Sequence, residues 1–258
     1  MKKSIFITGA ASGIGKATAE LFSEKGWYVG LFDVNEEDLS KLYSTIGSQN
    51  GCMKKVDVTD PEEIEEAVDF FVENTGGKMD VLFNCAGILR MGYHDKIPLD
   101  DQKKIVDINF QGILNCIDTC FDVLKQTAGS RIINMSSGSA VYGTPELAVY
   151  SATKFAVRGL TEALNIEFED YDIWVCDVMA PYVNTPMIQS APQKASSVSL
   201  LGVNLSPRQV AEVVWKAANG RKIHWVVSRK LKLLMLLNKM GNTSINRFMI
   251  KRLTFSGK

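Results

Sequence analysis

Short apolar runs alternate with helical patterns along the whole chain, and this order restricts the possible folds more than any other feature. The apolar runs, most of them rich in β-branched residues, are 4–7, 28–32, 52–57, 81–84, 131–135, 173–178 and 223–227. Helical patterns occupy 14–25, 36–47, 61–74, 100–125, 149–169 and 207–218, whereas 189–204 is expected to be a long loop. Such alternation is typical of a parallel sheet with helices on both faces, so we predict a doubly wound, seven-stranded α/β fold.

The composition is that of a globular protein, with 46% hydrophobic and 22% charged residues and no internal repeat or linker. No apolar stretch approaches the roughly 20 residues that cross a bilayer. The apolar run Ile5-Phe6-Ile7 is interrupted at Thr8, so it is too short for the apolar region of a secretory signal. Five cysteines without a CxxC pair are expected to be reduced thiols of a cytoplasmic protein, and two histidines without a ligand cluster predict no metal site.

A glycine-rich segment follows the first apolar run and leads directly into the first helical pattern. It reads Thr8-Gly9-Ala10-Ala11-Ser12-Gly13-Ile14-Gly15. Glycines let the backbone turn tightly and approach a pyrophosphate, and a helix N-terminus offers free N–H groups to it. We therefore predict dinucleotide-phosphate binding by Gly9, Ser12, Gly13, Ile14 and Gly15. A plain strand–helix turn is the alternative interpretation.

Asp33 ends the predicted second strand, directly after the apolar run 28–32 and 24 residues after Gly9, which is close to the usual interval of about 20 for a ribose-binding acid. A carboxylate there can accept hydrogen bonds from the adenosine ribose and would repel a 2′-phosphate. Neither Ser12 nor Val34, its expected neighbours, could neutralise that phosphate. NAD is therefore favoured over NADP, and a solvated acid at the start of a loop is the alternative.

Tyr150 and Lys154 lie four residues apart in a helical pattern and therefore share one face of the helix. A free tyrosine, with a pKa of about 10, is protonated at neutral pH. A nearby ammonium stabilises the phenolate, so such a tyrosine can exchange a proton with a reacting alcohol or carbonyl oxygen. Taken alone, the pair is also common on plain helix surfaces.

Five features that follow one another along the chain favour the catalytic interpretation of this pair. They are the loop Thr8–Gly15, the segment Asn84-Cys85-Ala86-Gly87, Asn109, Ser137 and the segment from Tyr150 to Lys154. With them, the whole chain resembles the short-chain dehydrogenase/reductase family. The resemblance implies a Rossmann-type domain in residues 1–228 that binds the dinucleotide and carries the catalytic residues. Residues 229–258 would be a basic, amphipathic, helical extension of the same domain.

The resemblance also implies a role for each catalytic residue. Ser137, thirteen residues before Tyr150, would hydrogen-bond the reacting oxygen, and Tyr150 would be the acid or base. Lys154 would lower the pKa of Tyr150 and bind the nicotinamide ribose. Asn109 would hold a water molecule that links Lys154 to solvent, although an asparagine inside a helix is also a common structural residue.

Further cofactor contacts follow from the same resemblance. Asn84, Ala86 and Gly87 would line the adenosine side and steady the central sheet. Asp57 and Val58 resemble the pair that contacts adenine, although an Asp that closes a strand is also a common capping residue. Pro181, Val183 and Thr185 would lie along the nicotinamide. At Pro181 the family usually has glycine, so one N–H is missing here and φ is fixed near −65°.

The charge of the chain is divided unequally although the net charge is zero. Residues 213–258 contain eleven basic residues and no acidic one, which leaves the first 212 residues with a net charge of −11. Segments 229–240 and 245–253 combine basic and large apolar residues in short helical patterns. Three interpretations remain open: a helix packed as a lid or subunit contact, a membrane-surface helix, or a site for an anionic protein such as an acyl carrier. Nucleic acid is disfavoured because the rest of the chain is acidic.

As a lid, the extension would form an apolar wall together with nearby leucines, namely Leu200, Leu201, Leu205, Leu233, Leu234 and Leu237. The predicted function is NAD-dependent hydride transfer between the nicotinamide and a secondary alcohol or ketone, with a lipophilic substrate and a homodimeric or homotetrameric enzyme. One alternative is an NADPH-preferring ketone or 3-oxoacyl reductase. Another is a membrane-associated nucleotide-binding protein without turnover.

Overall fold

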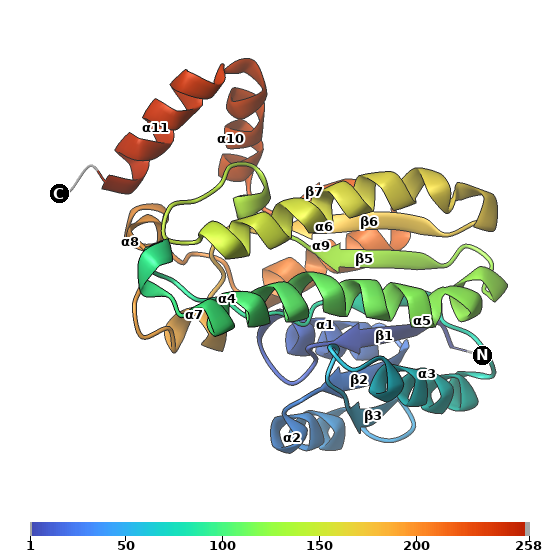
Figure 1. Ribbon diagram of the computed structural model, residues 1–258. Coiled ribbons are helices and arrows are strands. Elements are labelled where there is room, and N and C mark those ends of the chain that lie inside the picture. The colour runs from blue at the N-terminus through green and yellow to red at the C-terminus, as the bar shows by residue number, and fades with distance from the viewer. Residues whose placement is uncertain (1, 256–258) are drawn as a thin grey trace.

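Seven parallel strands form one sheet in the computed structural model, which describes residues 2–255 (Figure 1). Across the sheet the strand order is β3-β2-β1-β4-β5-β6-β7. The strands are β1 Ser4–Thr8, β2 Tyr28–Asp33, β3 Gly51–Lys55, β4 Val81–Asn84, β5 Arg131–Met135, β6 Trp174–Met179 and β7 His224–Val226. The predicted seven-stranded sheet is confirmed. Because the order reverses between β1 and β4, the carboxyl ends of these strands open a crevice that suits a ligand.

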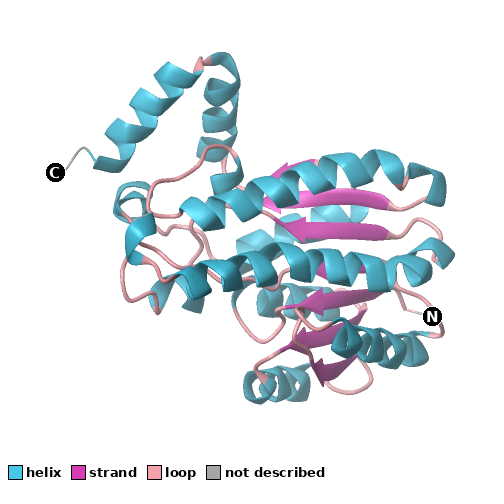
Figure 2. Ribbon diagram, viewed as in Figure 1, coloured by secondary structure: helices cyan, strands magenta, loops and turns pink. Residues whose placement is uncertain are grey.

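Helices cover both faces of the sheet, which explains why the strands are almost continuously apolar (Figure 2). Alternate side chains point to opposite faces, so Ile5 and Ile7 join one core while Phe6 joins the other. The first core packs against α1 Gly13–Glu24, α2 Glu36–Ile46 and α9 Pro207–Asn219. The second packs against α3 Pro61–Thr75, α5 Gly112–Gln126 and α6 Ala148–Glu167.

Three elements differ from the sequence prediction. The helix expected at 100–125 consists of α4 Leu99–Val106, a π-helical turn at Asp107–Gln111 and α5. The third strand ends at Lys55, so Asp57 lies in the following turn. The expected loop 189–204 begins at the end of α7 Pro186–Gln189 and contains α8 Ser196–Leu201, two helices too short for periodicity to reveal.

The C-terminal segment forms two helices, α10 Arg229–Met240 and α11 Thr243–Phe255, that rise from the body of the molecule (Figure 1). The inner face of α10 packs on the domain, since Leu231 is buried against Ala140, Val141 and Met179. Within residues 2–255, no helix has the length and apolar content needed to cross a bilayer. The end of the predicted extension, residues 256–258, lies outside the described residues.

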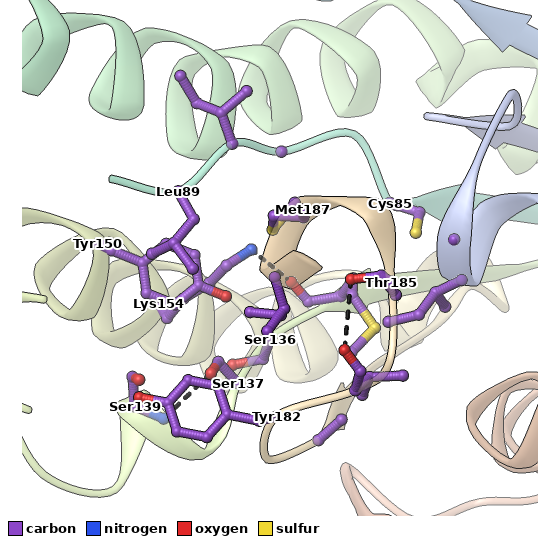
Figure 3. Close-up of a pocket in the computed structure, with 18 of the residues that line it drawn as sticks. Cys85, Leu89, Ser136, Ser137, Ser139, Tyr150, Lys154, Tyr182, Thr185 and Met187 are labelled. Atoms are coloured by element: carbon purple, nitrogen blue, oxygen red, sulfur yellow. Dashed lines mark hydrogen bonds between the residues drawn. The ribbon is translucent and has the colours of Figure 1, made fainter. Parts of the chain in front are cut away.

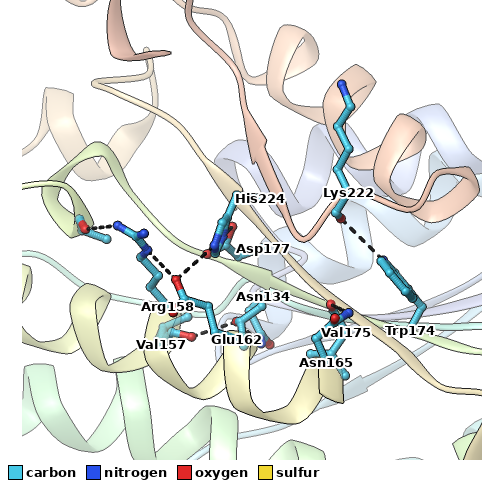
Figure 4. Close-up of polar contacts among 12 residues, drawn as sticks. Asn134, Val157, Arg158, Glu162, Asn165, Trp174, Val175, Asp177, Lys222 and His224 are labelled. Carbon is cyan, nitrogen blue, oxygen red and sulfur yellow. Dashed lines mark hydrogen bonds and ion pairs between the residues drawn. The ribbon is translucent and has the colours of Figure 1, made fainter. Parts of the chain in front are cut away.

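A polar network ties the β7 edge of the sheet to α6 (Figure 4). His224 lies between two carboxylates: its Nδ1 is 2.9 Å from Asp177 Oδ1 and its Nε2 is 3.1 Å from Glu162 Oε1. Asp177 is fully buried on β6, and this burial raises the pKa of its carboxyl. The hydrogen bond to the Asp177 carboxylate raises the pKa of His224. His224 therefore provides the contact that makes the buried carboxylate tolerable.

We expect His224→Leu to lower the free energy of unfolding by about 3 kcal/mol, because it leaves the buried Asp177 carboxylate without its partner. Among the described residues, His224 is the side chain that hydrogen-bonds Asp177 Oδ1, and Oδ2 has no hydrogen-bond partner. Urea unfolding at pH 7 measures the loss. The double variant His224→Leu/Asp177→Asn removes the charge as well and should recover part of the stability; a double variant no more stable than the single one would contradict this explanation.

Candidate active site

A pocket of about 560 Å³ lies at the carboxyl ends of the strands and extends to the C-terminal helices. It gathers most of the residues that the sequence singles out. Those that line it are Gly9, Ser12, Gly13, Ile14, Gly15, Asp33, Asp57, Val58, Ala86, Gly87, Ser137, Tyr150, Lys154, Pro181, Val183 and Thr185. Asn84 and Asn109 are the two predicted site residues that do not line it.

Both asparagines lie beneath the surface of the pocket. Asn84 is buried at the end of β4 and its Nδ2 donates to Asn134 Oδ1 at 2.9 Å, which joins β4 to β5. Asn109 sits in the π-helical turn, where its Oδ1 accepts from the Ile88 amide at 2.8 Å and its Nδ2 donates to the Ile88 carbonyl at 2.9 Å. Its side chain thus holds the segment after β4 in place; the water relay through Asn109 stays a prediction.

The glycine loop is fixed by two backbone approaches that leave no room for a side chain. A Cβ on Gly9, whose φ is +69°, would lie 2.8 Å from the backbone of Ala86. A Cβ on Gly15 would lie 2.0 Å from the Gly9 carbonyl oxygen. The first turn of α1 therefore stands directly on the loop, with its N-terminal amides at the pocket.

Thr8 fastens this loop to the segment after β4, a role that the sequence analysis did not assign. Its Oγ1 accepts from the amides of Cys85 and Ala86 at 3.1 and 3.2 Å. Thr8 and the two backbone approaches together give a rigid cradle, whose residues at the pocket are Gly9, Ser12, Gly13, Ile14 and Gly15. This cradle fits a pyrophosphate, which needs N–H groups at close range.

Asp33 lies at the end of β2, where its carboxylate organises both neighbouring turns. Its Oδ2 accepts from the Ala11 amide at 3.0 Å, and its Oδ1 accepts from the Asn35 amide at 2.9 Å. Val34 beside it is exposed. Among the described residues that line the pocket, Lys154 is the one cation, and it lies on α6 rather than beside Asp33.

Asp57 and Val58 also reach the pocket, from the turn that follows β3. The Asp57 carboxylate accepts from both the amide and the hydroxyl of Thr59, at 2.9 and 2.8 Å. Val58 is buried and packs against Gly112 at the start of α5. These contacts hold the turn in place. Asp57 thus caps the turn and also lines the pocket.

Ser137, Tyr150 and Lys154 converge at the end of β5 (Figure 3). Burial raises the pKa of Tyr150 to about 12, and its hydrogen bond with Ser137 opposes this rise. Burial lowers the pKa of Lys154 to about 8. The Lys154 ammonium donates to the Met135 carbonyl at 2.8 Å and lies 5.6 Å from the centre of the Tyr150 ring. Ser137 Oγ accepts from the Ser139 amide at 3.1 Å, which fixes the turn formed by residues 137–139, called the serine turn below.

The segment after β6 closes the pocket opposite the glycine loop. Pro181, Val183 and Thr185 all line it, and a Cβ on Gly13 would lie 3.2 Å from the methyl group of Thr185. Tyr182, which the sequence analysis did not select, shares a hydrogen bond of 2.7 Å with Ser197 on α8. The structure therefore places Pro181 at the pocket without a backbone N–H, as its residue type requires.

The outer part of the pocket is apolar, and its composition corrects part of the predicted leucine wall. Leu200, Leu201 and Leu234 line it as expected, but Leu205, Leu233 and Leu237 do not. Leu233 and Leu237 are 58% and 44% exposed, because α10 turns its opposite face, with Leu231 and Leu234, toward the domain. Further apolar lining residues that the sequence did not reveal are Leu89, Tyr142, Leu147, Met187, Ile188, Leu231 and Ile250.

In residues 2–255, no three His, Cys, Asp or Glu side chains are grouped so that they could hold a metal ion. The charged groups that line the pocket are Asp33, Asp57 and Lys154. The arrangement thus combines a glycine loop at the N-terminus of α1, a carboxylate at the end of β2 and a Tyr–Lys–Ser group of which Lys154 is buried. These parts are those of a site that moves a proton beside a bound dinucleotide.

Comparisons with known proteins agree with this geometry. The family model described as short chain dehydrogenase matches residues 3–196. The chain is 35% identical over 222 residues to a 3-oxoacyl-acyl-carrier-protein reductase of Thermotoga maritima, covering 82% of this chain and 88% of that protein. It is 31% identical over 217 residues to a cyclohexanol dehydrogenase of an Acinetobacter strain, covering 82% and 86%.

Solved structures show the same fold. A short chain dehydrogenase/reductase of Burkholderia phymatum in complex with NAD superposes with a TM-score of 0.82 at 22% identity, covering 92% of both chains. A 3-ketoacyl-acyl-carrier-protein reductase of Brucella melitensis complexed with NADH gives 0.79 at 25% identity, covering 87% of this chain and 96% of that one. With the family model matching most of its length, this chain belongs to the short-chain dehydrogenase family of oxidoreductases.

Proposed function

We propose that this enzyme is an NAD-dependent dehydrogenase/reductase that interconverts a lipophilic secondary alcohol and its ketone. The observation that carries this proposal is the convergence of Ser137, Tyr150 and Lys154 in a pocket that continues to the glycine loop. The glycine loop supports the cofactor proposal, because Gly9 packs against the Ala86 backbone and Gly15 against the Gly9 carbonyl, and the N-terminus of α1 then lies at the pocket. When bound, the nicotinamide accepts or supplies the hydride at its C4 atom.

The proton chemistry would belong to Tyr150. Burial favours the neutral phenol, so proton release needs compensating positive charge. Lys154 would supply that charge, because a side chain whose pKa is lowered to about 8 is still mainly in its protonated form at pH 7. Ser137 would hold the substrate oxygen beside the phenol, because both side chains line the same part of the pocket. In alcohol oxidation Tyr150 takes the hydroxyl proton, and in ketone reduction it returns one.

The preference for NAD over NADP would depend on Asp33. Asp33→Ala should lower the ratio of kcat/KM for NADH to that for NADPH by about 10- to 100-fold, since hydrogen bonds to a charged group contribute about 1.5–3 kcal/mol. Initial rates with both cofactors measure the ratio. Asp33→Asn is a useful companion, because it can keep one of the loop contacts to Ala11 and Asn35 while removing the charge. A wild-type enzyme that prefers NADPH would favour the alternative, an NADPH-dependent ketone or 3-oxoacyl reductase.

The substrate class follows from the outer pocket, which offers apolar side chains from α7, α8, α10 and α11 and no charged one among the described lining residues. We expect kcat/KM for a series of 2-alkanones to rise about threefold or more with each added CH₂ group that the pocket buries, since each contributes about 0.8 kcal/mol. NADH absorbance follows the rates. A flat series, or one that falls with chain length, would refute the lipophilic class while leaving the hydride chemistry intact.

We also propose a homodimer or homotetramer that pairs through α5 and α6. In support, these helices leave large apolar side chains partly exposed to solvent: Leu114 is 39%, Phe155 41% and Ile166 73% exposed. A cytoplasmic location is supported by the five cysteines, all of which are free thiols.

A further inference from the structure

The α10–α11 pair exposes apolar and basic side chains together on the part of the molecule that protrudes (Figure 1). Five large apolar side chains of the pair are 44–59% exposed: Leu233, Leu236, Leu237, Ile245 and Phe248. A helix of a soluble protein normally turns such residues inward. The pair does so on one face only, since Leu231, Leu234 and Met235 pack on the domain. The second apolar set is therefore left without a cover within the described chain.

The charge around these apolar side chains is of one sign. Residues 229–255 hold seven basic residues and no acidic one, in a chain whose first 212 residues carry a net −11. Arg247, Lys251 and Arg252 are exposed on α11, and the Arg252 guanidinium lies 5.4 Å from the centre of the Phe248 ring. Basic helices with exposed Leu and Phe bind to anionic lipid surfaces, with the apolar groups in the headgroup boundary.

The same two helices form part of the pocket wall. Leu231 and Leu234 from α10 and Ile250 from α11 line the main pocket. A second crevice of about 330 Å³ lies between α11 and the 142–145 segment, lined by Tyr142, Gly143, Pro145, Arg247, Ile250 and Lys251. It shares Tyr142 and Ile250 with the main pocket. An apolar pocket bordered by two cationic side chains suits an amphiphile whose polar head is anionic.

A lipid surface fits this face better than a second copy of the chain. A symmetric dimer would bring the same patch of both copies together, and seven basic residues on each would repel one another. An acidic protein would satisfy the charge, but it would leave unexplained why apolar side chains as large as Leu236 and Phe248 are interspersed with it.

We propose that α10 and α11 dock the enzyme on an anionic membrane, so that a lipophilic substrate passes from the bilayer between these helices into the pocket. The pair lies on the surface without spanning it, in agreement with its two short helices of 12 and 13 residues. Docking itself rests only on the surface of the pair. The passage of substrate rests in addition on the proposed function.

Vesicle flotation of the full-length enzyme tests the docking. We expect the enzyme to float with vesicles of phosphatidylglycerol and phosphatidylcholine, with a bound fraction at least tenfold above that for phosphatidylcholine alone. Leu233→Ser/Leu237→Ser/Phe248→Ser should lower the partition coefficient at least tenfold. Lys232→Gln/Arg252→Gln should remove most of the preference for anionic vesicles. The matched control is Leu99→Ser/Lys103→Gln on α4, where Leu99 is 64% exposed, and it should bind like the wild type.

Several results would overturn the proposal. One is a wild-type enzyme that remains with the unbound fraction on anionic vesicles. Another is a triple variant that floats as well as the wild type. A third is a triple variant whose sedimentation velocity shows a smaller oligomer in vesicle-free buffer, because a second copy would then be the occupant of this face.

Turnover of a short, water-soluble ketone with NADH separates docking from the proposed function. The triple variant should keep this activity without vesicles, since none of its three positions lines the pocket. An enzyme that floats but never turns over any ketone would refute the proposed function and leave docking standing. A triple variant that loses soluble turnover together with flotation, and that unfolds at a lower temperature, would show that these side chains support the fold instead, which also overturns the proposal.

Discussion

Tyr150→Phe should lower kcat by about 10³-fold while the affinity for the cofactor changes by no more than about twofold. A positioned acid or base contributes about 10²–10⁴-fold, and Tyr150 lines the pocket together with Ser137 and Lys154. The ring itself stays, so the packing of Leu89 and Leu147 near it is retained. Steady-state turnover and fluorescence titration with NADH give the two quantities.

Tyr182→Phe is the matched control, because it removes a phenol hydroxyl from the same pocket. That hydroxyl pairs with Ser197 on α8 and not with the serine turn. Its loss should alter KM more than kcat and should lower kcat by less than about tenfold. If Tyr150→Phe kept more than a tenth of wild-type turnover, the acid–base assignment would be wrong. If both variants lost activity equally, the loss would reflect damage to the pocket rather than to proton transfer.

Gly15→Ala should lower kcat/KM for NADH by about 100-fold, because shifts on the order of 1 Å at a positioned ligand have effects of this size. The added Cβ would lie 2.0 Å from the Gly9 carbonyl oxygen, so the loop and the first turn of α1 must separate. Strain of this kind also costs about 1–3 kcal/mol of stability. Cofactor titration and thermal unfolding measure the two effects.

Gly159→Ala is the control that isolates this close approach. Gly159 is exposed in the middle of α6 and a Cβ there meets nothing within 4 Å. Alanine should therefore stabilise the helix by up to about 1 kcal/mol and leave NADH affinity unchanged. A Gly15→Ala enzyme with wild-type affinity would show that the loop does not hold the phosphates. Loss of affinity in both variants would mean that the loss at Gly15 has another origin.

The fold could be predicted because its signals are local. Each strand is a short apolar run that is buried on both faces, as Ile5, Phe6 and Ile7 illustrate. The π-helical turn at Asp107–Gln111 could not be predicted, because such turns are rare and occur as single turns inside α-helices, with no sequence signal of their own. The same holds for α8, whose six residues are fewer than two turns of helix.

The site could be predicted where spacing along the chain fixes geometry. One helical turn joins Tyr150 to Lys154. The choice of Ser137 over Ser136 comes from the family resemblance and stays a prediction, because both serines line the pocket. What Asn84 and Asn109 contact could not be read in this way, because their partners, Asn134 and Ile88, are distant in sequence. The apolar wall is a similar case, since which leucines of α10 face inward depends on how that helix packs.

The late helices of the chain contribute wall residues to the pocket but none of its charged groups. The cradle, Asp33 and the Tyr–Lys–Ser group all come from the first 154 residues, whereas α8, α10 and α11 contribute apolar side chains and Ser197. Substitutions in those late helices can therefore reshape what enters the pocket while the cradle and the proton-transfer group remain as they are. Evolution, or a designer who grafts residues 186–255 from a relative, can exchange the range of substrates separately from the chemistry performed on them.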